Sequence, residues 1–273
     1  MHQVDLPDGV HVHAAAVPPG SAGHGLRQQR GIVRTTLRSS AAAAILAVAV
    51  ALLAVSCGSE PTPTPTPTIT AEDVRDSGAE ALRNLSTVHF LVTHEVGGTD
   101  IGFSSTLTEA EGDGLFPDKA EFVAKATSAL FGNAALELDI VQYGEITHLR
   151  DRISMVWQAL PAGTLAINFA NINGSIADAL ASLGELDLTD GGSVNGAPVH
   201  KLTGTTPSTS LRGLVPGAPE GETLHMEVWV GRDDYLVRKV RLTGRLVEAD
   251  TPDIVRVLEL SRFDEPVTIE PPA

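Results

Sequence analysis

The sequence of 273 residues contains a single cysteine, Cys57, and only 4% aromatic residues. One cysteine excludes an intramolecular disulfide and any cysteine-rich zinc or iron–sulfur site. Basic residues are also scarce, because 19 Lys and Arg stand against 34 Asp and Glu. A nucleic-acid partner is therefore not expected, since phosphate binding requires a basic surface. Hydrophobic residues reach 42%, which is typical of a globular protein with a buried core.

The common catalytic and metal-binding motifs are missing as well. The sequence has no G-x-S-x-G nucleophile elbow, and Glu111 to Gly114 lacks the further ligands of a calcium loop. Asp233-Asp234 is interpreted as a turn between two strands. No metal-ligand spacing such as H-E-x-x-H occurs among the histidines His89, His94, His148, His200 and His225. We therefore expect no enzyme activity, no metal site and no cofactor.

An apolar stretch of 15 residues, Ala41 to Val55, stands near the N-terminus. It is shorter than the roughly 20 residues that a membrane-spanning helix needs. Arg34 and Arg38 precede it and small residues follow it, which is typical of a signal-peptide core. An uncleaved membrane anchor with an unrelated cysteine is the alternative. Either interpretation exports the downstream chain and holds it at a membrane.

Cys57 follows Ala54-Val55-Ser56, which resembles the lipobox of bacterial lipoproteins, with Ala54 where a leucine is usual. The resemblance implies cleavage before Cys57 and a diacylglycerol on its sulfur. Two acyl chains are enough for stable anchoring, so we expect an exported protein, lipid-anchored to the outer face of the cell membrane. The run from Pro61 to Thr68 alternates proline and threonine and favours extended polyproline II. As a tether it reaches roughly 25 Å.

Downstream of the tether, the periodicity predicts a helix, a series of strands, a second helix and further strands. Thr70 and Asp73 form a capping-box pattern before a helix over 71–85, and Ser175 with Asp178 resembles a second cap. Turns are expected at Gly97-Gly98, at 111–114 and at Asn195-Gly196. The predicted strands cover 88–95, 101–107, 119–127, 134–143, 145–151, 199–204, 224–230, 236–247 and 254–263, with a short helix near 208–215. This order predicts an α+β fold, with one curved antiparallel sheet (a half-barrel) and helices over its concave face.

Several segments resemble the mycobacterial LppX/LprA/LprF/LprG lipoprotein family. They are Met226 to Leu246, Val255 to Pro272, the helix around Ile176 to Leu183, and Asn195 to Gly204. The resemblance implies the half-barrel fold of that family, which is similar to the Lol lipoprotein carriers. It also implies an apolar cavity for acylated lipids or lipoglycans, and an inner-membrane transporter as a partner. The chain then divides into residues 1–56 (N-terminal extension plus signal peptide), 57–70 (lipidated Cys57 and tether) and 71–273 (one lipid-binding domain).

Two functions remain open at this point: a carrier that binds acyl chains, and a packed envelope-interaction module without a ligand. Periodicity cannot separate them, because a filled core and a hollow one show the same alternation. One hypothesis places Trp157 at the mouth of a cavity. Trp229 is expected to face either solvent or a helix. The side chains expected to line the cavity are Phe90, Val92, Ile101, Phe103, Phe122, Leu136, Leu138 and Ile140 from the strands, and Ile176, Leu180 and Leu183 from the helix.

Overall fold

The computed structural model describes residues 68–272, so the predicted signal peptide, Cys57 and nearly all of the tether lie outside the described residues. The first element is helix α1 (Ala71–Asn84). The Thr70 side chain accepts a hydrogen bond from the Asp73 amide at 3.1 Å, and the Asp73 carboxylate accepts one from the Thr70 amide at 3.0 Å. These two bonds satisfy amides that the helix itself leaves free, and they confirm the predicted capping box.

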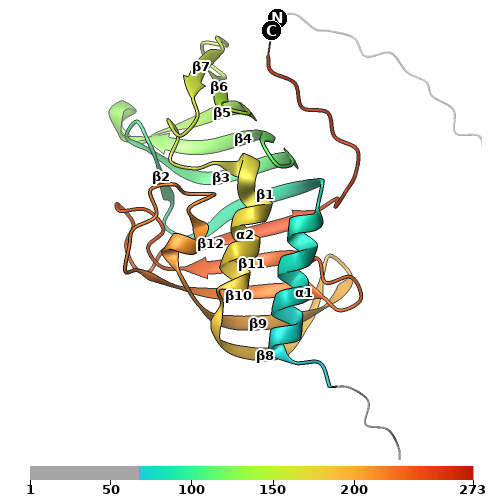
Figure 1. Cartoon of the computed structure of the whole chain (residues 1–273). Coiled ribbons are helices and arrows are strands. Elements are labelled where there is room, and N and C mark those ends of the chain that lie inside the picture. The colour runs from blue at the N-terminus through green and yellow to red at the C-terminus, as the bar shows by residue number, and fades with distance from the viewer. Residues whose placement is uncertain (1–67, 273) are drawn as a thin grey trace, which may run out of the picture. The chain divides into compact units, whose positions relative to one another are not determined.

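Twelve strands form one antiparallel sheet, which confirms the predicted fold class (Figure 1). Their spatial order is β7-β6-β5-β4-β3-β1-β12-β11-β10-β9-β8, and β2 pairs only with β3. The strands are β1 (Thr87–Val96), β2 (Thr99–Gly102), β3 (Ser105–Leu115), β4 (Lys119–Ser128), β5 (Ala134–Tyr143), β6 (Ile146–Asp151), β7 (Gln158–Pro161), β8 (Gly184–Val194), β9 (Ala197–Pro207), β10 (Thr223–Gly231), β11 (Val237–Thr243) and β12 (Val255–Ser261).

The first and last strands meet in the middle of this sheet, where Phe90 of β1 lies opposite Leu260 of β12. The chain must therefore cross from the β7 edge to the β8 edge, and helix α2 (Ile172–Ala181) is part of that crossing. Figure 1 shows α1 and α2 side by side over the same face of the sheet. They pack closely, since a Cβ atom at Gly78 of α1 would lie 3.2 Å from Leu180 of α2.

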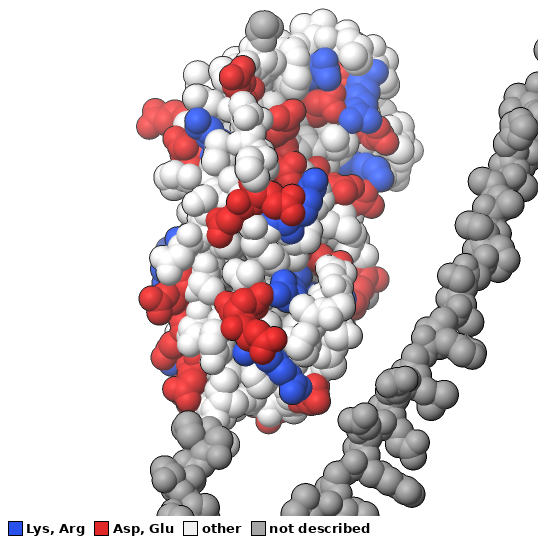
Figure 2. Space-filling model, turned by 90° about the vertical axis from the view of Figure 1, so that its right-hand side faces the viewer, with Lys and Arg blue, Asp and Glu red and all other residues white. Residues whose placement is uncertain are grey.

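The two faces of the sheet differ in the way that strand alternation predicts. In β10, the side chains of Leu224, Met226 and Val228 are fully buried toward the helices. Trp229 lies on the other face, where the ammonium groups of Lys201 and Lys239 are 4.9 and 5.6 Å from its ring centroid. On the side of the molecule that Figure 2 shows, basic side chains are interspersed among more numerous acidic ones.

Two predicted features of the early strands are wrong. Glu111 to Gly114 is part of β3 and does not form a turn. Gly112 lies close to β4, where a Cβ would come within 2.1 Å of the Glu121 carbonyl oxygen. Glycine serves there for close approach of two strands. The predicted strand 101–107 is instead broken by a turn at Phe103 and Ser104, whose φ angles are 55° and 53°. Phenylalanine and serine rarely adopt positive φ, so their identity gave no turn signal.

The predicted start of α2, after a cap at Ser175, is four residues too late. A 3-10 turn, η2 (Phe169–Asn171), leads directly into the helix, so Ser175 lies inside α2 and not at its cap. Its hydroxyl is buried and has no hydrogen-bond partner. Burial of Phe169 and Ile172 explains the earlier start, since both point into the core. Asp178, the expected cap partner, accepts a hydrogen bond from Arg83 of α1 at 3.0 Å.

None of the helices within residues 68–272 is long and apolar enough to cross a lipid bilayer. In the same part of the chain, no three His, Cys, Asp or Glu side chains are grouped in a way that could hold a metal ion.

Candidate functional site

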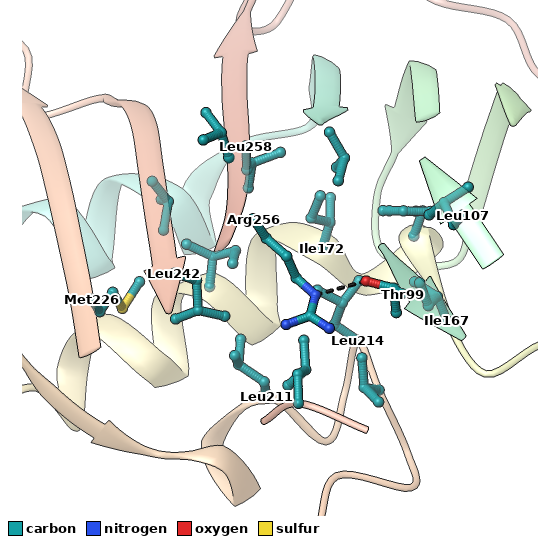
Figure 3. A pocket seen from close by; sticks show the side chains of 17 residues that line it. Thr99, Leu107, Ile167, Ile172, Leu211, Leu214, Met226, Leu242, Arg256 and Leu258 are labelled. Atoms are coloured by element: carbon teal, nitrogen blue, oxygen red, sulfur yellow. Dashed lines mark hydrogen bonds between the residues drawn. The ribbon is translucent and has the colours of Figure 1, made fainter. Parts of the chain in front are cut away.

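A small cavity lies between α2 and the middle of the sheet, and we call it the central cavity (Figure 3). It encloses about 50 Å³, little more than the share of one or two water molecules at about 30 Å³ each. Its walls are almost entirely apolar. The lining side chains include Val92, Leu107, Ile167, Phe169, Ile172, Ile176, Met226, Val240, Leu242, Leu246 and Leu258.

Arg256 of β12 is the charged member of this wall, and its guanidinium is nearly fully buried. Its Nε donates to the Thr99 hydroxyl at 2.7 Å, which is the dashed line in Figure 3. Nη1 donates to the Gly244 carbonyl at 3.2 Å, and Nη2 donates to the Asp250 carboxylate. Burial lowers the pKa of Arg256, while the negative charge of Asp250 acts in the opposite direction. The pair is therefore neutral as a unit, and each guanidinium nitrogen of Arg256 has a hydrogen-bond acceptor.

The network continues from Thr99 to His94 of β1. His94 Nδ1 lies 3.1 Å from the Thr108 carbonyl, and Nε2 lies 2.8 Å from the Thr99 hydroxyl. Because a carbonyl only accepts, Nδ1 carries the proton and Nε2 accepts from Thr99. Burial lowers the pKa of His94, and the nearby charge of Arg256 lowers it further. His94 is thus a neutral link between the surface and the buried Arg256.

A larger space, which we call the edge pocket, lies where β2 to β7 meet the segment before α2. It measures about 350 Å³, within the range of about 300 to 1,000 Å³ that small-molecule sites occupy. The side chains around it are mostly apolar: Ile101, Phe103, Leu130, Phe131, Leu136, Leu138, Leu149, Leu160 and Leu165. Three of them are also exposed to solvent, namely Phe103 (61%), Leu130 (69%) and Phe131 (69%). The edge pocket is therefore an apolar opening with an apolar rim.

A narrow space of about 10 Å³ lies between the edge pocket and the central cavity. It shares Ile101 and Leu165 with the edge pocket, and Leu107, Ile167 and Phe169 with the central cavity. Side chains from the segment 165–169 therefore fill the route between the two larger spaces. Phe169 is held in an aromatic cluster, with its ring centroid 5.0 Å from Phe90 and 4.9 Å from Phe122.

The same segment is fixed to the sheet by one buried amide side chain. Gln142 of β5 donates from Nε2 to the Ile167 carbonyl at 3.1 Å and accepts from the Ala170 amide at 3.0 Å. Asn168 adds a bond from its amide to the Leu214 carbonyl at 2.7 Å. These contacts order a stretch that belongs to neither a strand nor a long helix.

The side chains predicted to line a cavity are divided among these spaces. Val92 and Ile176 line the central cavity, and Phe122 and Ile140 line the narrow space. The edge pocket receives Ile101, Phe103, Leu136 and Leu138. Phe90, Leu180 and Leu183 are packed in the core and line none of the three.

Sequence reasoning missed Arg256 and the lining residues of β10 to β12. Arg256 stands between Val255 and Val257 in a strand that is otherwise apolar, and a lone charge in such a run was the available signal. Trp157 lies in a different place from the one considered. The Arg150 guanidinium sits 4.6 Å from its ring centroid, and Arg150 also binds Asp139 at 2.6 Å. Trp157 lines the polar groove that contains these residues, and it lines none of the three spaces above. Burial would raise the pKa of Asp139, but hydrogen bonds from Arg150 and Arg152 lower it overall.

Comparison with solved structures finds similarity to two mycobacterial proteins. LprF from Mycobacterium bovis is 16% identical, with a TM-score of 0.57 over 76% of this chain and 99% of that one. LppX from Mycobacterium tuberculosis is 18% identical, with a TM-score of 0.48 over 73% of this chain and 98% of that one. No curated protein sequence matches the chain at a significant level. The family model described as LppX_LprAFG lipoprotein matches residues 70–269. The chain therefore belongs to the LppX_LprAFG lipoprotein family.

Proposed function

We propose that the domain binds acyl chains of envelope lipids or lipoglycans and carries them within the cell envelope. The observation that carries the proposal is the edge pocket, about 350 Å³ in size, apolar, and open between exposed Phe103, Leu130 and Phe131. An opening of this kind exposes apolar surface to water at a cost, and an acyl chain removes that cost by filling it. Family membership supports the same function.

An acyl chain longer than the edge pocket would continue toward the central cavity. To do so it must displace Leu165, Ile167 and Phe169, which separate the spaces. Burial of a chain stabilises by about 0.8 kcal/mol per methylene, so eight methylenes supply about 6 kcal/mol. The two neutral hydrogen bonds of Gln142 that hold the segment contribute about 1 kcal/mol each. Leu165, Ile167 and Phe169 are themselves buried, and losing that burial would cost about 1.5 to 3 kcal/mol each. The route therefore opens only when these side chains repack against the acyl chain.

The test places a tryptophan in the wall of the edge pocket. Leu136→Trp fills space that is open, so we expect the thermal midpoint to change little while the amount of bound lipid falls. Leu188→Trp is the matched control, because Leu188 is similarly half-buried on β8 and lines none of these spaces. Lipid is measured by solvent extraction of the purified protein and mass spectrometry. Equal lipid content in both variants would remove the edge pocket as the binding site.

A packed interaction module without a ligand is the second candidate. The small central cavity favours it, since about 50 Å³ holds no acyl chain without rearrangement. A parent protein that never yields extracted lipid would leave this module as the function.

We further propose that Cys57 carries the membrane anchor and that the Pro/Thr run holds the domain off the bilayer. Cys57→Ala should give uncleaved precursor or protein that is shed from the membrane. Normal membrane retention with the normal processed mass would contradict this. An inner-membrane transporter is the partner that family membership supports for loading the lipid.

A further inference from the structure

Three segments of the domain contain no charged residue, and they meet at the edge pocket. They are 101–108, 126–136 and 153–166. Each contributes lining residues to the pocket, for example Phe103, Phe131 and Leu160. Their freedom from charge is notable in a chain with 34 acidic and 19 basic residues. The rim of the pocket is therefore a neutral, apolar zone on an acidic protein.

Two of these segments form tips that are tied together. The β2–β3 turn contains Phe103, and the β4–β5 connection contains the 3-10 turn η1 (Ala129–Phe131). The Ala129 amide donates to the Ser104 carbonyl at 2.9 Å, which joins the tips. Within the second tip, the Asn133 amide donates to the Ser128 carbonyl at 2.8 Å. Internal bonding of this kind matters because a backbone amide without a partner is costly to bring into an apolar medium.

From these observations we propose that the two tips insert Phe103, Leu130 and Phe131 into the surface of a lipid bilayer, with the edge pocket facing the membrane. The proposal rests on the proposed function, because it takes the edge pocket as the place that a lipid enters. The same side chains line the pocket and form its exposed rim. A lipid that moves from the bilayer into the pocket would then stay against apolar surface throughout and would not cross water.

A bilayer fits this zone better than a protein partner does. The exposed side chains are large and apolar and surround the edge pocket, so a surface that also supplies acyl chains can cover the rim and fill the pocket at once. Phenylalanine and leucine are among the residues that bury their side chains at a membrane surface. The acidic balance of the rest of the chain opposes approach to an anionic surface, so a neutral zone is the part of the domain that such a surface repels least.

The experiment measures flotation of residues 68–272 with lipid vesicles. This part contains the whole sheet, both helices and the buried core, and it lacks Cys57, so any binding comes from the domain itself. We expect binding to phosphatidylcholine vesicles that persists at high salt, because the contact is apolar. The variant Leu130→Ser/Phe131→Ser should reduce partitioning at least about tenfold, since two large apolar side chains lose their burial. Both residues are exposed, so the fold should be unaffected.

Ile146→Ser is the matched control. Ile146 is an exposed apolar residue (47%) at the β5–β6 turn, which lies at the end of β5 opposite the tips. Equal flotation of the tip variant and the parent, or no flotation of the parent, would overturn the proposal. So would self-association of the parent that the tip variant abolishes without any vesicle binding, since the zone would then be a protein interface.

Extracted lipid, measured in the same samples, separates the two proposals. Leu136→Trp fills the pocket and leaves Leu130 and Phe131 in place. If this variant floats like the parent while it carries less lipid, membrane docking is a step distinct from lipid binding. A parent that floats but never carries lipid supports docking and removes the carrier function.

Discussion

Arg256 of β12 and Asp250 in the loop after β11 form a buried ion pair at the wall of the central cavity. The Asp250 carboxylate also accepts hydrogen bonds from the amides of Leu246 and Val247, at 2.8 and 2.9 Å. The pair therefore holds the loop after β11 against β12, beside the central cavity. A charge buried without its partner is strongly destabilising, so removal of one member of the pair should lower the stability of the fold by a measurable amount.

Asp250→Ala should lower the free energy of unfolding by about 3 to 5 kcal/mol, because the Arg256 guanidinium loses its counter-charge while still buried. Urea denaturation measures the loss. Asp253→Ala is the control, since the pKa of Asp253 is lowered mainly by its hydrogen bond to Thr251 at the surface. A loss for Asp250→Ala below about 1 kcal/mol would show that water reaches the guanidinium.

His94 should make stability depend on pH. Burial lowers its pKa below the usual value of about 6.5, so the folded protein binds fewer protons than the unfolded chain near that pH. The stabilising contribution of neutral His94 is therefore complete above about pH 6.5 and is lost as the pH falls below it. The thermal midpoint of the parent should drop more between about pH 7.5 and about pH 5 than that of His94→Gln.

Both proteins in that comparison retain His200, whose pKa is also lowered by burial, so the difference between them isolates His94. The other charges near His94 are Arg256, which lowers its pKa, and Asp250, which raises it. Parallel pH profiles for parent and variant would contradict the prediction.

Gln142→Met should loosen the segment that separates the edge pocket from the central cavity. The substitution keeps the size of the side chain but leaves the Ile167 carbonyl and the Ala170 amide without partners. We expect a loss of about 2 to 4 kcal/mol in unfolding free energy and faster hydrogen exchange at 168–171. Gln158→Met on β7 is the control, because Gln158 is exposed. Unchanged exchange at 168–171 would show that the aromatic cluster alone fixes the segment.

Leu180→Trp should destabilise by about 1 to 3 kcal/mol through overpacking. Leu180 is fully buried and faces Gly78 of α1, where even one added methyl group would be 3.2 Å from it. The larger indole therefore has no room between the helices. A thermal midpoint equal to that of the parent would reveal space between α1 and α2 that the packed helices do not show.

Local chemistry was enough to predict most of the elements. The alternation of β5 gave its bounds, Ala134–Tyr143, and the capping box gave the start of α1. Asn195-Gly196 forms the predicted hairpin turn, with φ angles of 50° and 81°. Signals of this kind depend on neighbours within a few residues, so the sequence contains them fully.

The errors come from contacts between distant residues. Gly112 resembles a turn glycine, but its role depends on the closeness of β4, which no local pattern contains. The helix stripe of Ile176, Leu180 and Leu183 shows the same limit. All three are buried, but only Ile176 lines the central cavity, because Leu180 packs toward α1. Periodicity identifies a buried face, and the shape of the partner surface decides whether a space remains beside it.

The meeting of β1 and β12 in the middle of the sheet has a consequence for how the protein is made. Synthesis produces β1 to β7 long before β12 exists, so the outer edge of β1 stays unpaired until nearly the whole chain is available. An unpaired strand edge is a template for association with other chains, and long-range pairing of this kind folds slowly. The free edge of β1 can therefore associate with other chains until β12 has been synthesised and pairs with it. A truncation that removes Val255–Ser261 would split the sheet in two, whereas removal of the edge strand β7 would only shorten it.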